Sequence, residues 1–253
     1  WEDPQPHRAR AEQLYLEVIE AQQRILGPDH PETLRTIYNL GSLLVNQERL
    51  AEAEVLLRQA AEGRKRVLGP THRATLMAQT DIAYVLRRSG QSREAEELLR
   101  DILGHQQTVL EPYHREIRGT LNALFTLLVE EERFADARPV MAALIEILEY
   151  DAERDSASAE AHDRYARALA TCELEEFRDP ALALRHAARA VEMSQGRNPD
   201  YLLTLAHAQS LDGDDSQAYA TVTSALELLP PDHEDRPTFE ADRARFARRD
   251  GVR

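Results

Sequence analysis

Histidine is the residue type in this chain whose spacing first suggests chemistry. His30, His72 and His114 stand 42 residues apart, and the first two close the same phrase, Leu-Gly-Pro-x-His. Imidazoles are common zinc ligands, but each must approach the ion to about 2 Å. Equivalent residues of neighbouring packed helices lie about 8 to 10 Å apart, so these three cannot share one ion. We expect them to play a structural role in the linkers and predict no metal site.

Other reactive groups are few. The acidic turn Asp212-Gly-Asp-Asp215 lacks the residue order of a calcium loop, and the cluster Glu173, Glu175 and Glu176 is typical of a solvated loop. The lone Cys172 has no recognisable histidine partner, and we expect it to pack as a small apolar side chain. Metal-binding, phosphate-loop and nucleophile motifs are absent from the sequence. We therefore expect neither a catalytic residue nor a cofactor.

The period of 42 extends from the histidines to the apolar positions that must place them. Leu40, Ile82 and Leu124 match one another in this register. Apolar residues recur at intervals of three and four within each copy, which predicts two helices joined by a short polar turn, and therefore an antiparallel pair. Gly90 and Gly213 are expected to end first helices. Ser92 and Ser216 are expected to cap the helices that follow.

These positions resemble a known family. Leu40, Gly41, Leu44, Leu57 and Ala60 fall where tetratricopeptide repeats carry their characteristic residues. The 42-residue copies with the Leu-Gly-Pro-x-His linker resemble the kinesin-light-chain type of this repeat. The resemblance implies an all-α fold, a right-handed superhelix, or α-solenoid, of antiparallel helix pairs, in which each repeat stacks on its neighbours.

The resemblance also implies boundaries. We expect an array over residues 1–231, with a half repeat at 8–27 and repeats at about 32–66, 74–108, 116–150, 157–195 and 199–231. Ala11 and Val18 lie 42 residues before Ala53 and Ala60, so the first helix of the chain matches the second helix of a repeat. Because Trp1 is not an initiator methionine either, we expect the chain to be part of a longer protein.

A terminal helix is expected at residues 237–250, after the break at Pro230 and Pro231. Phe239 and Phe246 fall on one face of this segment, together with the aliphatic stem of Arg243. Such a helix would cover the exposed core of the last repeat.

The resemblance places ligand contacts on the inward face of successive first helices. These positions carry amides, tyrosines and arginines, which suit a peptide backbone, apolar side chains and carboxylates. The candidate groove comprises Arg35, Tyr38, Asn39, Ser42, Asn46, Thr80, Asp81, Tyr84, Arg87, Arg88, Asn122, Thr126, Glu130, Asp163, Arg167, Leu203 and His207. We expect a partner segment that combines acidic residues with a large apolar anchor. The family's carboxylate-clamp pattern is not reproduced in this sequence.

Composition limits the partners further. A net charge of −14 disfavours nucleic acid, whose phosphates require a basic face. No apolar run approaches the roughly 18 residues of a membrane span, so we expect a cytoplasmic protein without a membrane partner. Lys65 is the only lysine among the 31 basic residues, a bias that favours a bacterial source.

The sequence leaves three functional readings open. The first is a noncatalytic protein- or peptide-binding scaffold. The second is the regulatory or substrate-recruiting tail of a signalling enzyme, since Asp179 to Leu184 and Arg197 to Ala206 resemble the closing repeats behind some bacterial serine/threonine kinase domains. The third is a self-association scaffold in which an exposed repeat end pairs with another copy.

Overall fold

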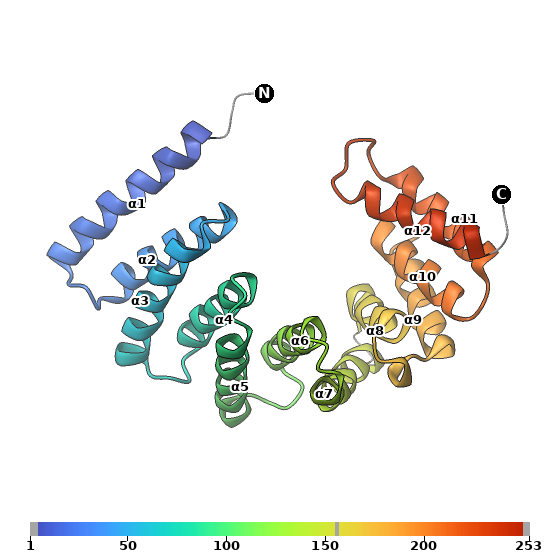
Figure 1. The fold of residues 1–253 in the computed structure, drawn as a ribbon, viewed down its shortest axis with the longest axis horizontal. Coiled ribbons are helices and arrows are strands. Elements are labelled where there is room, and N and C mark those ends of the chain that lie inside the picture. The colour runs from blue at the N-terminus through green and yellow to red at the C-terminus, as the bar shows by residue number, and fades with distance from the viewer. Residues whose placement is uncertain (1–4, 155–156, 250–253) are drawn as a thin grey trace. The chain divides into compact units, whose positions relative to one another are not determined.

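The computed structural model describes residues 5–154 and 157–249, with side chains described from residue 10 onward; Trp1 and Asp250, which entered the boundary predictions, lie outside these ranges. Every element in the described residues is helical (Figure 1). The helices are α1 (Gln5–Ile25), α2 (Pro31–Asn46), α3 (Leu50–Leu68), α4 (Arg73–Arg88), α5 (Ser92–Val109), α6 (Arg115–Glu130), α7 (Phe134–Glu153), α8 (Ala159–Thr171), the 3₁₀ helix η1 (Glu175–Phe177), α9 (Pro180–Met193), α10 (Pro199–Leu211), α11 (Asp215–Leu228) and α12 (Arg236–Arg249). The predicted all-α fold is confirmed. The helices fall into two compact units, Trp1–Glu131 and Glu132–Arg253.

In the first unit, each helix packs on the next one along the chain, from α1 through α6. Small residues let these helices approach closely. A Cβ on Gly63 of α3 would lie 2.3 Å from Leu34 Cδ2 of α2, and one on Gly41 would lie 3.0 Å from Leu57. The leucines of one helix therefore sit directly on the glycines of its partner, and the 42-residue pattern specifies this packing.

The three repeated histidines cap the first helices. In each case Nδ1 accepts a hydrogen bond from a backbone N–H two residues on, at 3.1 to 3.2 Å, at the start of α2, α4 or α6. The preceding glycines, Gly27 and Gly69, have positive φ, which glycine adopts without steric cost. The structural role expected for His30, His72 and His114 is thus helix capping.

The turns inside the repeats confirm the glycines and correct the serines. Gly90 and Gly213 have positive φ as expected. The predicted serine caps are wrong, because Gln91 and Asp214 occupy the cap positions and each serine lies inside its helix. With its backbone already helical, Ser92 uses its hydroxyl to donate to Glu131 instead, at 2.6 Å.

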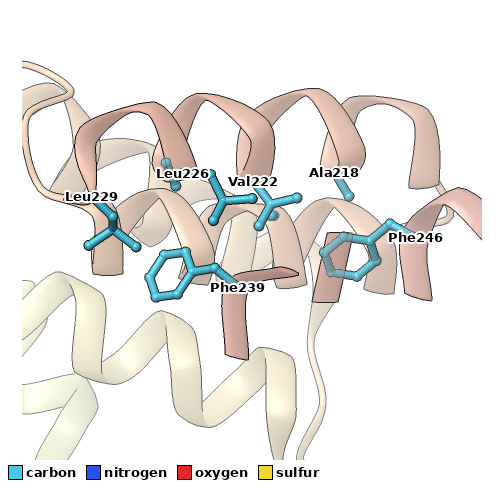
Figure 2. Close-up of a cluster of buried hydrophobic side chains, with 8 residues drawn as sticks. Ala218, Val222, Leu226, Leu229, Phe239 and Phe246 are labelled. Carbon is cyan, nitrogen blue, oxygen red and sulfur yellow. The ribbon is translucent and has the colours of Figure 1, made fainter. Parts of the chain in front are cut away.

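The second unit contains α7 to α12, and its core includes the aromatic residues expected of a terminal helix. Phe239 and Phe246 of α12 are buried against Ala218, Val222 and Leu226 of α11 (Figure 2). Arg236 adds a polar contact, since its Nη1 donates to the carbonyls of Leu226 and Leu229 at the end of α11. These groups have no partner within their own helix, so α12 also caps α11.

The long turn between α8 and α9 is ordered by its own contacts. It contains η1, and Nε of Arg178 donates to the carbonyl of Cys172 at 2.7 Å. Cys172 is buried, and burial raises the pKa of its thiol. A buried thiol held in the neutral form packs as an apolar group and is a poor nucleophile.

Candidate functional site

The predicted groove residues of the first unit lie on α2, α4 and α6. Several of them are exposed, namely Arg35, Asn39, Asn46, Tyr84, Arg88, Asn122 and Glu130. Others are half-buried, namely Tyr38, Ser42, Thr80, Asp81, Arg87 and Thr126. The hydroxyls of Thr80 and Thr126 donate to carbonyls of their own helices, one turn back. These hydroxyl protons are therefore already donated within the helix and are not available to a ligand.

Tyr38 and Asp81 are partners of each other. The hydroxyl of Tyr38 donates to Oδ2 of Asp81 at 2.6 Å, and the guanidinium of Arg64 stacks 4.3 Å from the centre of the tyrosine ring. Burial raises the pKa of both Tyr38 and Asp81. This cluster joins α2, α3 and α4, so Tyr38 contributes to packing between repeats and does not present a free aromatic plate.

The arginines expected to bind a carboxylate already have carboxylate partners. Arg87 pairs with Glu130 of the next repeat. Arg88 pairs with Glu48 at 2.7 Å and also donates to the Tyr84 hydroxyl at 2.8 Å. Exposed pairs of this kind contribute little stability, because solvent screens the two charges. A ligand carboxylate can therefore displace the glutamates. Until then, the glutamates largely neutralise the positive charge of Arg87 and Arg88.

A cavity of about 390 Å³ opens between α4 and α6, next to these residues. Its lining combines apolar side chains with a polar rim: Arg73, Leu76, Met77, Thr80, Asp81, Gln106, Arg115, Glu116, Arg118, Gly119 and Thr120. Gln106 reaches it from α5 and is 3% exposed, and its Oε1 accepts no hydrogen bond from the described residues. A buried carbonyl without a donor costs about 1 to 3 kcal/mol, which a bound donor would recover.

The predicted residues of the second unit mostly serve internal contacts. Asp163 is buried and pairs with the exposed Arg167 at 3.1 Å, and burial raises the pKa of its carboxyl. Leu203 packs against the terminal core cluster. His207 lies with Nε2 3.0 Å from Asp242 of α12 and its ring edge-on to Phe246. Of these four, Arg167 alone is exposed.

Comparison with known proteins identifies the repeats. A family model described as tetratricopeptide repeat matches residues 8–66 and 35–108. Residues 8–108 of this chain thus match tetratricopeptide repeats.

Several solved structures share the fold of this chain. One is a kinesin light chain-like protein of Podosopora anserina with nearly identical TPR-like repeats, with a TM-score of 0.58, 20% identity, and coverage of 79% of this chain and 96% of that one. Another is BtubC (BKLC) from P. vanneervenii, with a TM-score of 0.63, 17% identity, and coverage of 87% and 90%. A third is pilF of Pseudomonas aeruginosa, with a TM-score of 0.55, 17% identity, and coverage of 87% of this chain and 86% of that one. No curated protein sequence matches the chain.

The tetratricopeptide pattern did not predict the cavity. Met77, Gly119 and Arg115 line it but were not among the expected groove positions. The register contained one usable signal, because Arg73 and Arg115 follow the capping histidines of successive repeats and must stand at equivalent places. The sequence contains no signal that marks Gln106 as part of the cavity, because a buried amide in a second helix looks like any other polar position in that helix.

The residues that the structure describes contain no metal-binding cluster and no membrane-spanning helix. No three His, Cys, Asp or Glu side chains there are grouped so as to hold a metal ion. None of the helices described is both long and apolar enough to cross a bilayer. Tetratricopeptide repeats generally act as scaffolds for protein interaction through the extended surfaces of their stacked helices.

Proposed function

We propose that the first unit is a noncatalytic module that binds an extended peptide along α2, α4 and α6. The cavity between α4 and α6 carries this proposal, because it is large enough for one big side chain. Leu76 and Met77 provide apolar walls. Gly119 of α6 has no side chain, so the space beside it stays open. Apolar walls with a few placed polar groups are typical of anchor pockets.

The chemistry of the rim defines the peptide. Arg115 is exposed at the start of α6, and Arg73 is exposed while paired to Glu116 at 2.7 Å. Both favour acidic residues beside the anchor. The unpaired Oε1 of Gln106 favours a donor, which a backbone N–H of the peptide can supply. The expected ligand is therefore a large apolar residue flanked by acidic ones.

The cavity can be filled without disturbing the fold. A Cβ on Gly119 would meet no atom within 4 Å, so Gly119→Leu should occupy the cavity while stabilising α6, since leucine is a better helix former than glycine by about 0.8 kcal/mol. Gly104→Leu on α5 is the matched control, because a Cβ there also meets no neighbour and Gly104 does not line the cavity.

The test is an array of peptides in which one apolar residue is flanked by varied charges, followed by affinity measurement for the hits. Gly119→Leu should weaken binding at least tenfold and Gly104→Leu should not. Tyr84→Ala and Asn122→Ala, on the exposed surface beside the cavity, should each cost about 1 kcal/mol. Hits that bind Gly119→Leu as tightly as the parent chain would remove the cavity from the proposal.

A further inference from the structure

A second cavity lies in the other compact unit, where α8 packs on α9 and on α7. Its volume is about 640 Å³, and it is lined mainly by Glu153, His162, Arg185, His186, Arg189 and Glu192. Four of these side chains carry nitrogen donors and two carry carboxylates. None of them belongs to the candidate groove, so peptide binding along α2, α4 and α6 gives them no role.

His186 is the buried member of this cavity, at 3% exposed. Its Nε2 lies 3.0 Å from Nη2 of Arg185 and 3.2 Å from Oε1 of Glu153, which itself accepts from Arg185 at 2.6 Å. Burial lowers the pKa of His186 below its ordinary value, so the ring is neutral near pH 7. Because arginine can only donate, Nε2 accepts from Arg185 and the ring proton is on Nδ1.

His162 accepts the hydrogen bond that His186 donates, since the two Nδ1 atoms lie 2.9 Å apart. Burial lowers the pKa of His162 as well, so its single ring proton is on Nε2. Among the described residues, none accepts a hydrogen bond from this Nε2–H. His162 is half-buried and lines the cavity. The chain of hydrogen bonds that begins at Arg185 therefore ends in a free N–H donor at the cavity wall.

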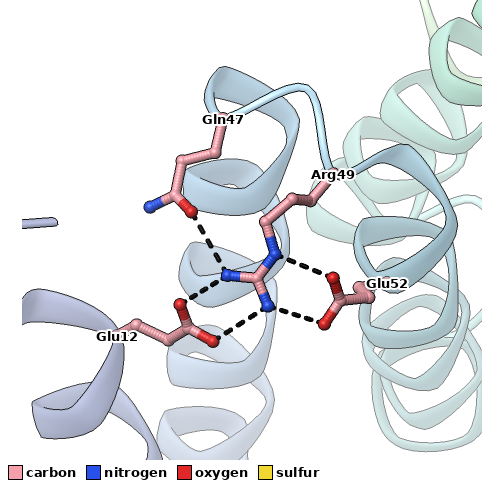
Figure 3. Close-up of polar contacts among 4 residues, drawn as sticks. All are labelled: Glu12, Gln47, Arg49 and Glu52. Carbon is pink, nitrogen blue, oxygen red and sulfur yellow. Dashed lines mark hydrogen bonds and ion pairs between the residues drawn. The ribbon is translucent and has the colours of Figure 1, made fainter. Parts of the chain in front are cut away.

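Arg49 of the first unit shows a guanidinium group whose nitrogens all have partners. Its Nε and Nη2 donate to the two oxygens of Glu52 at 2.7 and 2.6 Å, and Nη2 also donates to Glu12 at 3.1 Å (Figure 3). Its Nη1 donates to Gln47 at 3.3 Å and to Glu12. An arginine in this state can bind a ligand only by losing an internal partner.

The two arginines of the second cavity keep unused donors. Arg185 donates to described residues only through Nη2, and Arg189 only through Nη1, to Glu192 at 2.6 Å. They lie four residues apart on α9, so their side chains share one side of that helix. Each arginine therefore retains Nε and one Nη for a further acceptor.

We propose that this cavity binds a phosphate monoester. A carboxylate has two oxygens, which one guanidinium edge satisfies, whereas a phosphate has three acceptor oxygens and a charge of about −1.5 to −2 at pH 7. Two guanidinium groups and the His162 N–H match the phosphate. Glu153 and Glu192 do not block it, because their side chains are 52% and 71% exposed and can turn into solvent. This site is separate from the α4–α6 cavity and does not depend on peptide binding there.

The first probe is inorganic phosphate, titrated into the full chain at constant ionic strength and about pH 7.5, where both rings are neutral. We expect saturable shifts of the His162 and His186 ring signals by NMR. Acetate should bind at least tenfold more weakly, because it has neither the third oxygen nor the second charge. A short labelled peptide with one phosphoserine distinguishes the source of the group. Tighter binding than inorganic phosphate assigns the site to phosphorylated protein segments, and equal or weaker binding assigns it to small phosphate monoesters.

Arg189→Met should weaken phosphate binding at least tenfold, because it removes one guanidinium group from the cavity. Arg138→Met is the matched control. It removes the same charge and breaks one exposed pair, between Arg138 of α7 and Glu176 at 2.6 Å, but Arg138 does not line the cavity. Unchanged circular dichroism verifies that both variants are folded.

Three outcomes would overturn the proposal. Phosphate could give no saturable shift of the two histidines, acetate could bind as tightly as phosphate, or Arg189→Met and Arg138→Met could bind phosphate with the same affinity. The last two results would mean general attraction of anions to surface arginines. Gly119→Leu should leave phosphate binding unchanged, so failure at this site is distinguishable from failure at the α4–α6 cavity.

Discussion

The Tyr38 hydroxyl and the Asp81 carboxylate are joined at 2.6 Å across a repeat boundary, 43 residues apart. Arg73 with Glu116 and Arg87 with Glu130 are separated by the same 43 residues. Because the repeat is 42 residues long, each pair joins one position of a first helix to the next position of the following first helix. Successive repeats are thus held in register by polar ties on the surface expected to bind ligand.

Removing the tyrosine hydroxyl should destabilise the first unit. Tyr38→Phe leaves a half-buried carboxylate without its donor, which costs about 1 to 3 kcal/mol in the free energy of unfolding. The pKa of Asp81, already raised by burial, should rise further, because the bond from Tyr38 lowers it. Urea denaturation and an NMR titration of Asp81 measure the two effects. Tyr84→Phe, at an exposed ring, is the control and should change stability by less than about 0.5 kcal/mol.

The sequence predicts the helices but not the ion pairs between repeats, and Phe246 and Arg87 show why. Two aromatic residues on one face of a helix have one efficient placement, so the sequence predicts that Phe239 and Phe246 lie in a core. The partner of Arg87 depends on how successive repeats stack. Glu130 lies 43 residues after Arg87, one residue more than the 42-residue repeat. No pattern within a single repeat contains that offset, so the sequence does not predict the pair between Arg87 and Glu130.

Loss of a histidine cap should weaken its helix by a predictable amount. His72→Ala removes the acceptor for the Ala74 N–H, and loss of an N-cap costs about 1 kcal/mol. His72→Asn should recover most of this, because an asparagine oxygen can accept the same bond. Because His72 is exposed, little packing is lost. Thermal unfolding of both variants measures the difference, and equal losses for alanine and asparagine would refute capping as the role of this histidine.

Two helical glycines should respond oppositely to alanine. Gly63→Ala places a methyl group 2.3 Å from Leu34, so α2 and α3 must move apart, and overpacking typically costs about 1 to 3 kcal/mol. Gly104→Ala meets no neighbour and should stabilise α5 by about 0.5 to 1 kcal/mol. Chemical denaturation of the two variants measures the change in the free energy of unfolding, which should fall for Gly63→Ala and rise for Gly104→Ala. Stabilisation by Gly63→Ala would show that α2 and α3 are not packed as described.

The aromatic contacts of α12 should hold the end of the second unit together. Phe246→Ala empties a fully buried site and should cost about 3 to 5 kcal/mol. Deleting the chain from Thr238 onward should expose the core cluster around Val222 and cause association. Analytical ultracentrifugation tests the deletion. A stable monomer after the deletion would contradict the covering role of this helix.

A pair of histidines in the second unit should make its stability depend on pH. Nδ1 of His162 on α8 lies 2.9 Å from Nδ1 of His186 on α9, close enough for one ring to donate to the other. Nε2 of His186 lies 3.0 Å from Arg185 and 3.2 Å from Glu153, and the Tyr165 ring packs edge-on to His186. If both rings are protonated, both Nδ1 atoms become donors and the contact cannot form.

The direction of the pH effect follows from the two pKa values. Burial lowers the pKa of both histidines below the ordinary 6.5, aided at His162 by Arg189 and at His186 by Arg185; Glu153 opposes the shift. The unfolded chain therefore binds these protons more readily than the folded one, so the contribution to stability is full above about pH 6.5 and is lost as the pH falls below it.

Melting temperatures between pH 7.5 and 5.0 test this dependence. The parent chain should lose stability over that range, and His162→Gln should lose less, because one titrating ring is gone while an amide can still reach His186. His233→Gln, in the turn before α12 and away from the pair, should retain the parental slope. If His162→Gln and the parent chain lose stability in parallel, the pH dependence does not originate in the contact between His162 and His186.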